Sequence, residues 1–214
     1  MERISKKEAV AALHRARIME AAERLFSEKG FEATTIDDIS KASEYSRRTI
    51  YAYYESKEDI LHHIIEKGLR SLKADIENAA NDNAGFVEAY RAVFGAKSRN
   101  RKEYPYSFEI LKRSGTAEVE RSATSDTLKN IFCLGTEINK ILEALIVCGQ
   151  KNGEVRKDVA PVLTVYVLSA SLDSLLALNE TNGKFICDEN GMTENEFLEY
   201  GFRQIINSIL EVRI

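Results

Sequence analysis

The sequence predicts an all-α protein of about nine helices, divided into an N-terminal three-helix helix-turn-helix domain (residues 1–55) and a larger C-terminal helical domain (56–214). Three observations lead to this fold class. The 214 residues include only 2 prolines and 11 glycines, too few for the many turns of a β architecture. Apolar residues recur at three- and four-residue steps along most of the chain. Residues 34–57 show the pattern of two short helices joined by a tight polar turn.

The first two helices are predicted from an apolar stripe and from capping residues. Helix 1 is expected over roughly Lys7–Lys29, and Gly30 ends it because glycine readily adopts the left-handed conformation. Helix 2 begins after Thr35, a good N-cap, and carries Asp37 and Asp38 where the helix dipole favours acids. The expected stripe of helix 1 consists of Leu13, Ile18, Ala21, Ala22, Leu25 and Phe26.

The third helix separates its residues into two faces. Ser46 is its expected N-cap, and Tyr45, Ile50 and Tyr54 lie near one turn apart, so they should anchor it in a core. Arg47, Arg48, Tyr51 and Ala52 then project away from that core. Arginine can make two parallel hydrogen bonds to guanine O6 and N7, worth about 1–3 kcal/mol of discrimination between bases. The outer face of this helix therefore has the chemistry of a DNA-reading surface.

This stretch resembles the DNA-binding segment of the TetR family of bacterial transcription regulators. The resemblance rests on Thr34-Thr35-Ile36, on Ser46-x-x-Thr49-Ile50-Tyr51-x-Tyr53-Tyr54 and on Ser56-Lys57-Glu58, and it covers roughly residues 11–65. It implies a transcriptional repressor that binds a palindromic operator as a homodimer and is released by a small molecule. The DNA contacts that it implies, with Thr35, Tyr53 and Lys57 on phosphates, are Thr35, Ser46, Arg47, Arg48, Thr49, Tyr51, Tyr53 and Lys57.

Two features of the turn and of helix 3 depart from the family pattern. Glu44 stands where the family usually has glycine at a positive φ, so a glutamate there either costs about 1 kcal/mol or indicates a slightly different turn. Tyr45 and Tyr54 replace residues without a hydroxyl, and these hydroxyl groups need hydrogen-bond partners if buried. Both departures bear on the tilt of the recognition helix.

Two C-terminal helices are predicted to form a dimer interface. The penultimate helix, roughly Asp158–Asn179, is apolar over most of its circumference, which predicts burial on all sides. The last helix begins at Thr193, with Glu196 three residues later as a capping box. The alternative is that the two helices complete a monomeric core. The expected interface residues are Val162, Tyr166, Leu172, Leu176, Phe202, Ile205 and Ile209.

The middle of the chain is where the family resemblance implies a small-molecule effector. Aromatic residues at helical spacing are also typical of an ordinary core, so both readings stay open. The scarcity of charge in these stripes favours an uncharged or amphipathic effector. The candidate lining residues are Phe86, Tyr90, Phe94, Tyr104, Tyr106, Phe108, Phe132 and Cys133.

Charge and cysteine content limit the other possible functions. The net charge is −4, and residues 1–60 contain 11 Lys plus Arg against 12 Asp plus Glu, so DNA binding must depend on a local patch. The cysteines, Cys133, Cys148 and Cys187, lack metal-site spacing, and free, mostly buried thiols suit a reducing cytoplasm. Neither a signal peptide nor an 18-residue apolar stretch is recognised, so we expect no membrane association.

Catalysis and metal binding find no support in the sequence. It lacks a Gly-rich phosphate loop and the GxSxG, HExxH and CxxC motifs, so neither an enzyme nor a cofactor is expected. His62 and His63 are adjacent and point about 100° apart on a helix, which prevents them from forming one metal-binding face. The alternative functions are a helical protein-interaction module and a ligand-independent regulator.

Overall fold

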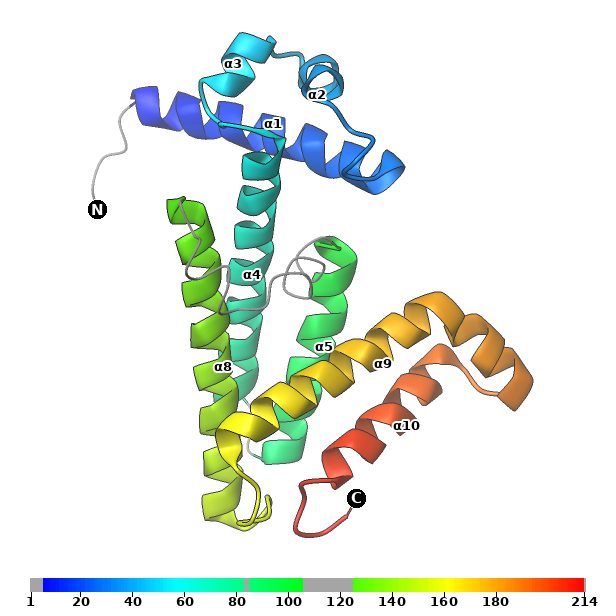
Figure 1. Ribbon diagram of the computed structural model, residues 1–214. Helices are drawn as coiled ribbons and strands as arrows, with labels where there is room; N and C mark the ends of the chain where they lie inside the picture. The colour runs from blue at the N-terminus through cyan, green and yellow to red at the C-terminus, as the bar shows by residue number, and fades with distance from the viewer. Residues whose placement is uncertain (1–5, 83–84, 106–124, 214) are drawn as a thin grey trace. The chain divides into compact units, whose positions relative to one another are not determined.

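The described part of the protein is helical almost throughout. The computed structural model describes residues 6–82, 85–105 and 125–213, and Figure 1 labels their helices. The β structure in these residues is one isolated antiparallel bridge between Val155 and Leu210, so the all-α prediction is confirmed. The helices are α1 (Lys6–Lys29), α2 (Ile36–Ser43), α3 (Arg47–Tyr51), α4 (Lys57–Asp82), α5 (Phe86–Glu103), α8 (Asp126–Asn152), α9 (Pro161–Asn190) and α10 (Glu194–Asn207).

The chain divides into two compact units. The first combines Met1–Leu69 with Glu103–Phe132, and the second combines Arg70–Lys102 with Cys133–Ile214. The predicted domain of residues 1–55 lies within the first unit. Helices α4 and α8 each contribute residues to both units, so each is a continuous element common to the two.

Local capping determines where α2 and α3 begin. The Thr35 hydroxyl accepts a hydrogen bond from the Asp38 amide at 3.2 Å, and the Asp38 carboxylate accepts one from the Thr35 amide at 2.9 Å. This reciprocal capping box satisfies two amides that would otherwise lack a partner at the helix start. Ser46 caps α3 in the same manner by accepting from the Thr49 amide at 3.1 Å. Both predicted N-caps are confirmed.

The core of the first unit comes from one face of each of its N-terminal helices. In Figure 1, α2 and α3 lie together along one side of α1. Each fully buried aliphatic or aromatic side chain contributes about 1.5–3 kcal/mol relative to exposure. Leu13 was assigned to the buried stripe of α1, but it is 53% exposed, so the stripe begins one turn later. The buried residues include Ile18, Ala22, Phe26, Ile39, Ile50, Tyr54, Ile60, Ile64 and Ile65.

The second unit is held together by close helix packing and by ion pairs. Helices α9 and α10 lie side by side and run in opposite directions (Figure 1). Gly201 permits their close approach, because a Cβ there would lie 2.6 Å from the Leu175 side chain. The Lys97 ammonium of α5, which is almost fully buried, donates to both carboxylate oxygens of Asp173 at 2.9 and 3.1 Å. Desolvation of the two charges offsets much of their attraction, so this pair adds little net stability.

Helix α9 differs from its prediction in length and in burial. It continues to Asn190, eleven residues beyond the expected end, and it ends at Gly191 with φ 63°. It was expected to be buried on all sides, but Leu163 and Val167 are 66% and 64% exposed. Among the residues described, α9 is also the helix long and apolar enough to cross a membrane, although a packed soluble helix passes the same test. The match rests on length and composition alone, so the expectation of no membrane association stays a prediction.

The cysteines were expected to be mostly buried, and this holds for one of the three. Cys187 is buried, whereas Cys133 and Cys148 are exposed on α8. The two exposed thiols lie on the side of α8 that its apolar stripe leaves uncovered. All three are free.

Tyr90 on α5 carries an isolated polar atom. The side chain is 1% exposed, and its hydroxyl has no hydrogen-bond partner among the described residues. Burial raises the pKa of Tyr90, so the group stays protonated as a potential donor. A buried hydroxyl without a partner costs about 1–3 kcal/mol.

We therefore expect Tyr90→Phe to leave the melting temperature unchanged or to raise it by up to about 4 °C, because it removes that desolvation cost. Tyr54→Phe is the matched control, since the Tyr54 hydroxyl donates to the Arg15 carbonyl at 3.1 Å. That substitution removes a formed hydrogen bond and should cost about 1 kcal/mol. Thermal denaturation of both variants tests the comparison, and an equal loss in both would mean that the Tyr90 hydroxyl is paired in solution.

Candidate nucleic-acid interface

Helix α3 presents a compact exposed surface formed by Arg47, Arg48 and Tyr51. All three are exposed, and Tyr51 is 55% exposed. On the opposite side of the helix, Ile50 is fully buried and Tyr54, just after the helix, is 2% exposed. Five residues are too few for a helix to be stable alone, so this anchoring is what keeps α3 folded and fixes the direction of its arginines.

The predicted contact residues Thr35, Ser46 and Thr49 have hydroxyl groups at helix starts. Thr35 and Ser46 are exposed, and Thr49 is half-buried with its hydroxyl 2.9 Å from that of Ser46. The Thr35 hydroxyl also donates to Asp38 at 2.6 Å. These groups are thus engaged in caps, yet each remains at the surface beside the first turn of α2 or α3, where unpaired amides favour anions.

Tyr53 and Lys57, the other predicted phosphate contacts, bind within the first unit. The Tyr53 hydroxyl lies 3.0 Å from Nδ1 of His14 on α1. The Lys57 ammonium donates to the Phe31 carbonyl at 2.8 Å and lies 4.2 Å from the centre of the Phe31 ring. An ammonium has three donors, so Lys57 retains two for another acceptor. Both residues secure the segments around α3 to α1 and to the turn after it.

Asp37 is a functional candidate that sequence reasoning missed. Its carboxylate pairs with the Arg47 guanidinium through Nε and Nη2. The two residues are ten positions apart and lie on different helices, so no local pattern connects them. The sequence explained Asp37 by the helix dipole alone, whereas the structure gives it a partner on the exposed face of α3.

Asp38, the neighbouring acid, has a structural role. Its carboxylate lies 2.7 Å from the Lys29 ammonium, and this contact, followed by the bonds to Thr35, holds the pKa of Asp38 well below its usual range. A depressed carboxyl pKa adds stability that is fully present above the unfolded value near pH 3.9 and is lost as the pH falls through the folded value.

We therefore expect Asp38→Ala to lower the melting temperature at pH 7 and to matter progressively less below about pH 4, where the wild-type carboxylate begins to lose this advantage. Melting curves of both proteins between pH 2 and 7 measure the effect. A difference that stays constant across this range would show that the carboxylate charge contributes nothing.

Glu44 ends α2 in the left-handed conformation, with φ 61° and ψ 19°. It is the one non-glycine residue with a positive φ among those described, so the turn keeps the left-handed conformation rather than adopting a different one. We expect Glu44→Gly to raise the free energy of unfolding by about 0.5–1 kcal/mol, because glycine adopts this conformation without steric strain. Chemical denaturation measures this change.

The control for Glu44 is Lys41→Gly, at an exposed position within α2. A glycine in a helical conformation should instead destabilise the protein by about 1 kcal/mol. Opposite signs for the two glycine substitutions support backbone strain at Glu44. The same sign for both would refute it.

The predicted effector residues are separated by the structure. Phe86, Tyr90 and Phe94 are buried on α5 in the second unit, and the Phe86 and Tyr90 rings lie 5.0 Å apart. Tyr104 is buried in the first unit, Phe132 on α8 is half-buried and Cys133 is exposed. Tyr106 and Phe108 lie outside the described residues. The exposure of Cys133 makes it a poor lining residue for an enclosed pocket, which corrects that assignment.

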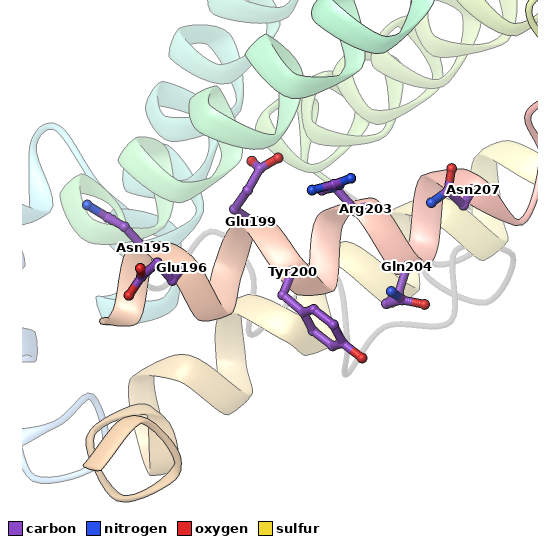
Figure 2. A pocket seen from close by; sticks show the side chains of 7 residues that line it. All are labelled: Asn195, Glu196, Glu199, Tyr200, Arg203, Gln204 and Asn207. Atoms are coloured by element: carbon purple, nitrogen blue, oxygen red, sulfur yellow. The ribbon is translucent and has the colours of Figure 1, made fainter. Parts of the chain in front are cut away.

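An open groove of about 520 Å³ lies along α10 (Figure 2). Glu199 and Arg203 point to one side of the helix, and Tyr200 and Gln204 to the other. The predicted effector residues do not line this groove. Its lining consists of Asn195, Glu196, Glu199, Tyr200, Arg203, Gln204 and Asn207.

The predicted dimer residues fall into two groups. Val162 and Tyr166 are 50% and 56% exposed, and Ile205 is half-buried, so all three are accessible to a partner. The other four are buried within the protomer: two on α9, one on α10 and one just beyond the end of α10. These core residues, corrected here, are Leu172, Leu176, Phe202 and Ile209.

Known proteins resemble this chain most specifically in the segment that contains α2 and α3. The sequence model for bacterial regulatory proteins of the tetR family matches residues 18–64, which include α2, α3 and the start of α4. The uncharacterized HTH-type transcriptional regulator YhgD of Bacillus subtilis is 28% identical over 152 residues, 71% of this chain and 76% of the relative. The HTH-type transcriptional repressor NicS of Pseudomonas putida is 29% identical over 165 residues, 72% of this chain and 71% of the relative.

The similarity extends through the C-terminal helices. The crystal structure of the TetR family regulator PfmR from Thermus thermophilus superimposes with a TM-score of 0.65 at 25% identity, covering 88% of this chain and 96% of PfmR. All three similar proteins are named as regulators of transcription rather than as enzymes. The shared N-terminal motif, the exposed arginines of α3 and the all-helical architecture lead to one assignment. The chain belongs to the TetR family of bacterial transcriptional regulators.

Proposed function

We propose that this protein is a cytoplasmic repressor that binds a palindromic operator as a homodimer and releases it when a small molecule binds. The observation that carries the proposal is the exposed surface of Arg47, Arg48 and Tyr51 on a helix anchored from behind by Ile50. Arginine and tyrosine donors at this position can reach base edges in the major groove. Thr35, Ser46, Thr49, Tyr53 and Lys57 are proposed to contact the backbone on either side.

The proposed dimer contact is an exposed stripe along α9. Leu163, Val167, Leu178 and Phe185 are between 41% and 69% exposed, and they recur at spacings of 4, 11 and 7 residues, which keeps them on one side of the helix. Ala170 and Ser174, between them, are also exposed and small enough for a partner helix to approach closely. An apolar stripe of this length would be costly in water, and a second copy of α9 covers it by symmetry. Val162 and Tyr166 adjoin this stripe on α9, and the half-buried Ile205 of α10 is proposed to join the interface.

The proposed effector site lies among the helices of the second unit. Phe86, Tyr90 and Phe94 supply apolar surface, and the Tyr90 hydroxyl, which has no partner in the described part of the chain, supplies a donor for a polar atom of the effector. Helix α4 runs continuously from the first unit into the second. An effector that favours one position of α4 would therefore change the separation of the two recognition helices, by no more than its differential affinity for the two states.

The decisive experiment is selection of bound duplexes from a random DNA pool by the full-length protein. We expect a palindromic sequence whose half-site centres are separated by about one helical turn or a multiple of it. Affinity for the selected duplex should fall as salt rises, with a slope set by the number of phosphate contacts. Recovery of no enriched sequence, together with a flat salt response, would favour the alternative of a helical protein-interaction module.

A further inference from the structure

The pairing of Asp37 with Arg47 bears on how the protein selects its DNA sequence. An acid on a DNA-facing surface repels phosphates, so an exposed carboxylate there needs a compensating role. Asp37 lies in the first turn of α2, and its side chain is 45% exposed, while that of Arg47 is 63% exposed. Both groups therefore stand at the surface where the proposed duplex would lie.

The guanidinium atoms that Asp37 engages determine which N–H donors of Arg47 remain available to DNA. The Asp37 carboxylate accepts from Nε and Nη2, the side edge of the guanidinium. Both N–H groups of Nη1 and the second N–H of Nη2 remain unused by this pair, and one N–H from each of these nitrogens forms the end edge of the guanidinium. That end edge is the fork that matches the O6 and N7 acceptors of guanine. Asp37 thus restricts the rotation of Arg47 without occupying its base-reading donors.

We propose that Asp37 is a positioning residue that makes Arg47 specific for guanine at one position of each half-site. The carboxylate holds the guanidinium plane so that its end edge faces the base, and it keeps Arg47 from turning towards a phosphate. It also repels the backbone at that point, so binding without the correct base is weakened. Arg48 has no partner among the described residues and lacks this constraint.

The inference rests on the proposed function, and the same selection can test both separately. Wild-type protein should enrich guanine at a fixed position of each half-site and discriminate against other bases there by roughly 5- to 150-fold, which corresponds to 1–3 kcal/mol. Asp37→Ala should reduce this ratio to a few-fold while binding non-specific duplex more tightly. The dependence of its DNA affinity on salt concentration should steepen by the equivalent of about one phosphate contact, because the freed Arg47 turns to a phosphate.

Two further variants separate positioning from charge and from folding. Glu44→Gln removes one negative charge from the same unit without changing the contact to Arg47. It should therefore change the affinity for every duplex slightly and leave the preference for guanine over other bases intact. Arg47→Lys keeps the positive charge but lacks the paired N–H donors of the guanidinium. It should therefore reduce the discrimination in favour of guanine as much as Asp37→Ala does. Combining it with Asp37→Ala should add no further loss, because both changes remove one interaction.

The outcomes distinguish the inference from the function on which it rests. If wild-type protein selects no sequence, the proposed function fails. If wild-type protein selects a sequence and Asp37→Ala retains the full ratio at every position, Asp37 has no positioning role. If Asp37→Ala loses affinity equally for all DNA sequences and also has a lower melting temperature, Asp37 is a purely structural residue. That result would also overturn the inference.

Discussion

Replacing Arg47 and Arg48 together with alanine is expected to abolish sequence-specific DNA binding. Each arginine can contribute about 1–3 kcal/mol of base discrimination, so the double variant should lose between roughly 30-fold and more than 1,000-fold in affinity for the selected duplex. Both side chains are exposed, and Ile50 and Tyr54 on the buried side are untouched. The fold should therefore persist. Gel-shift titration at fixed salt measures the affinity.

The control for this variant removes the same charge elsewhere. Lys140 and Lys151 are exposed on α8, and Lys140→Ala with Lys151→Ala lowers the net charge by the same two units. Because DNA recognition depends on a local patch rather than on the overall field, this variant should bind nearly as tightly as the wild type. Unchanged affinity of the double arginine variant, with helicity and dimerisation intact, would refute the assignment of α3 as the recognition helix.

The second large effect is expected at the apolar stripe of α9. Replacing Leu163 and Val167 with glutamate should convert the dimer into a monomer, because each chain would bury two carboxylates that have no partner. An unpaired charge costs several kcal/mol on burial, so the dimerisation constant should fall at least about a thousandfold. Operator affinity should fall with it, since a monomer reads one half-site. Sedimentation velocity measures the oligomeric state.

The exposure of these residues makes the result interpretable. Leu163 and Val167 already contact solvent in the protomer, so glutamate should leave its core and melting behaviour largely intact. Val10 on α1, which is 45% exposed, provides the matched control, and Val10→Glu should leave the oligomeric state unchanged. A dimer that survives both stripe substitutions would place the interface on another surface, and the groove of α10 would then be the next to test.

Local features of the fold were predictable because they depend on residues within about one turn of each other. Thr35 with Asp38, Ser46 with Thr49, and Thr193 with Glu196 all form the expected caps. The positive φ of Glu44 is one of the two alternatives that the glycine of the family pattern left for this turn. The stripe of α1 and the anchoring role of Ile50 followed from helical periodicity. Such interactions need no knowledge of which helices become neighbours.

The tertiary structure decided which apolar faces are covered and which distant groups meet. The sequence showed that α9 is apolar on most sides, but only its packing within the second unit distinguishes buried Leu172 from exposed Val167. Tyr53 approaches His14 across 39 positions, and Asp37 pairs with Arg47 across ten. These contacts connect separate helices, and periodicity carries no information about the relative placement of helices. The sequence alone thus determined the family, the helices and their caps, while three-dimensional packing decided how the recognition arginines are held.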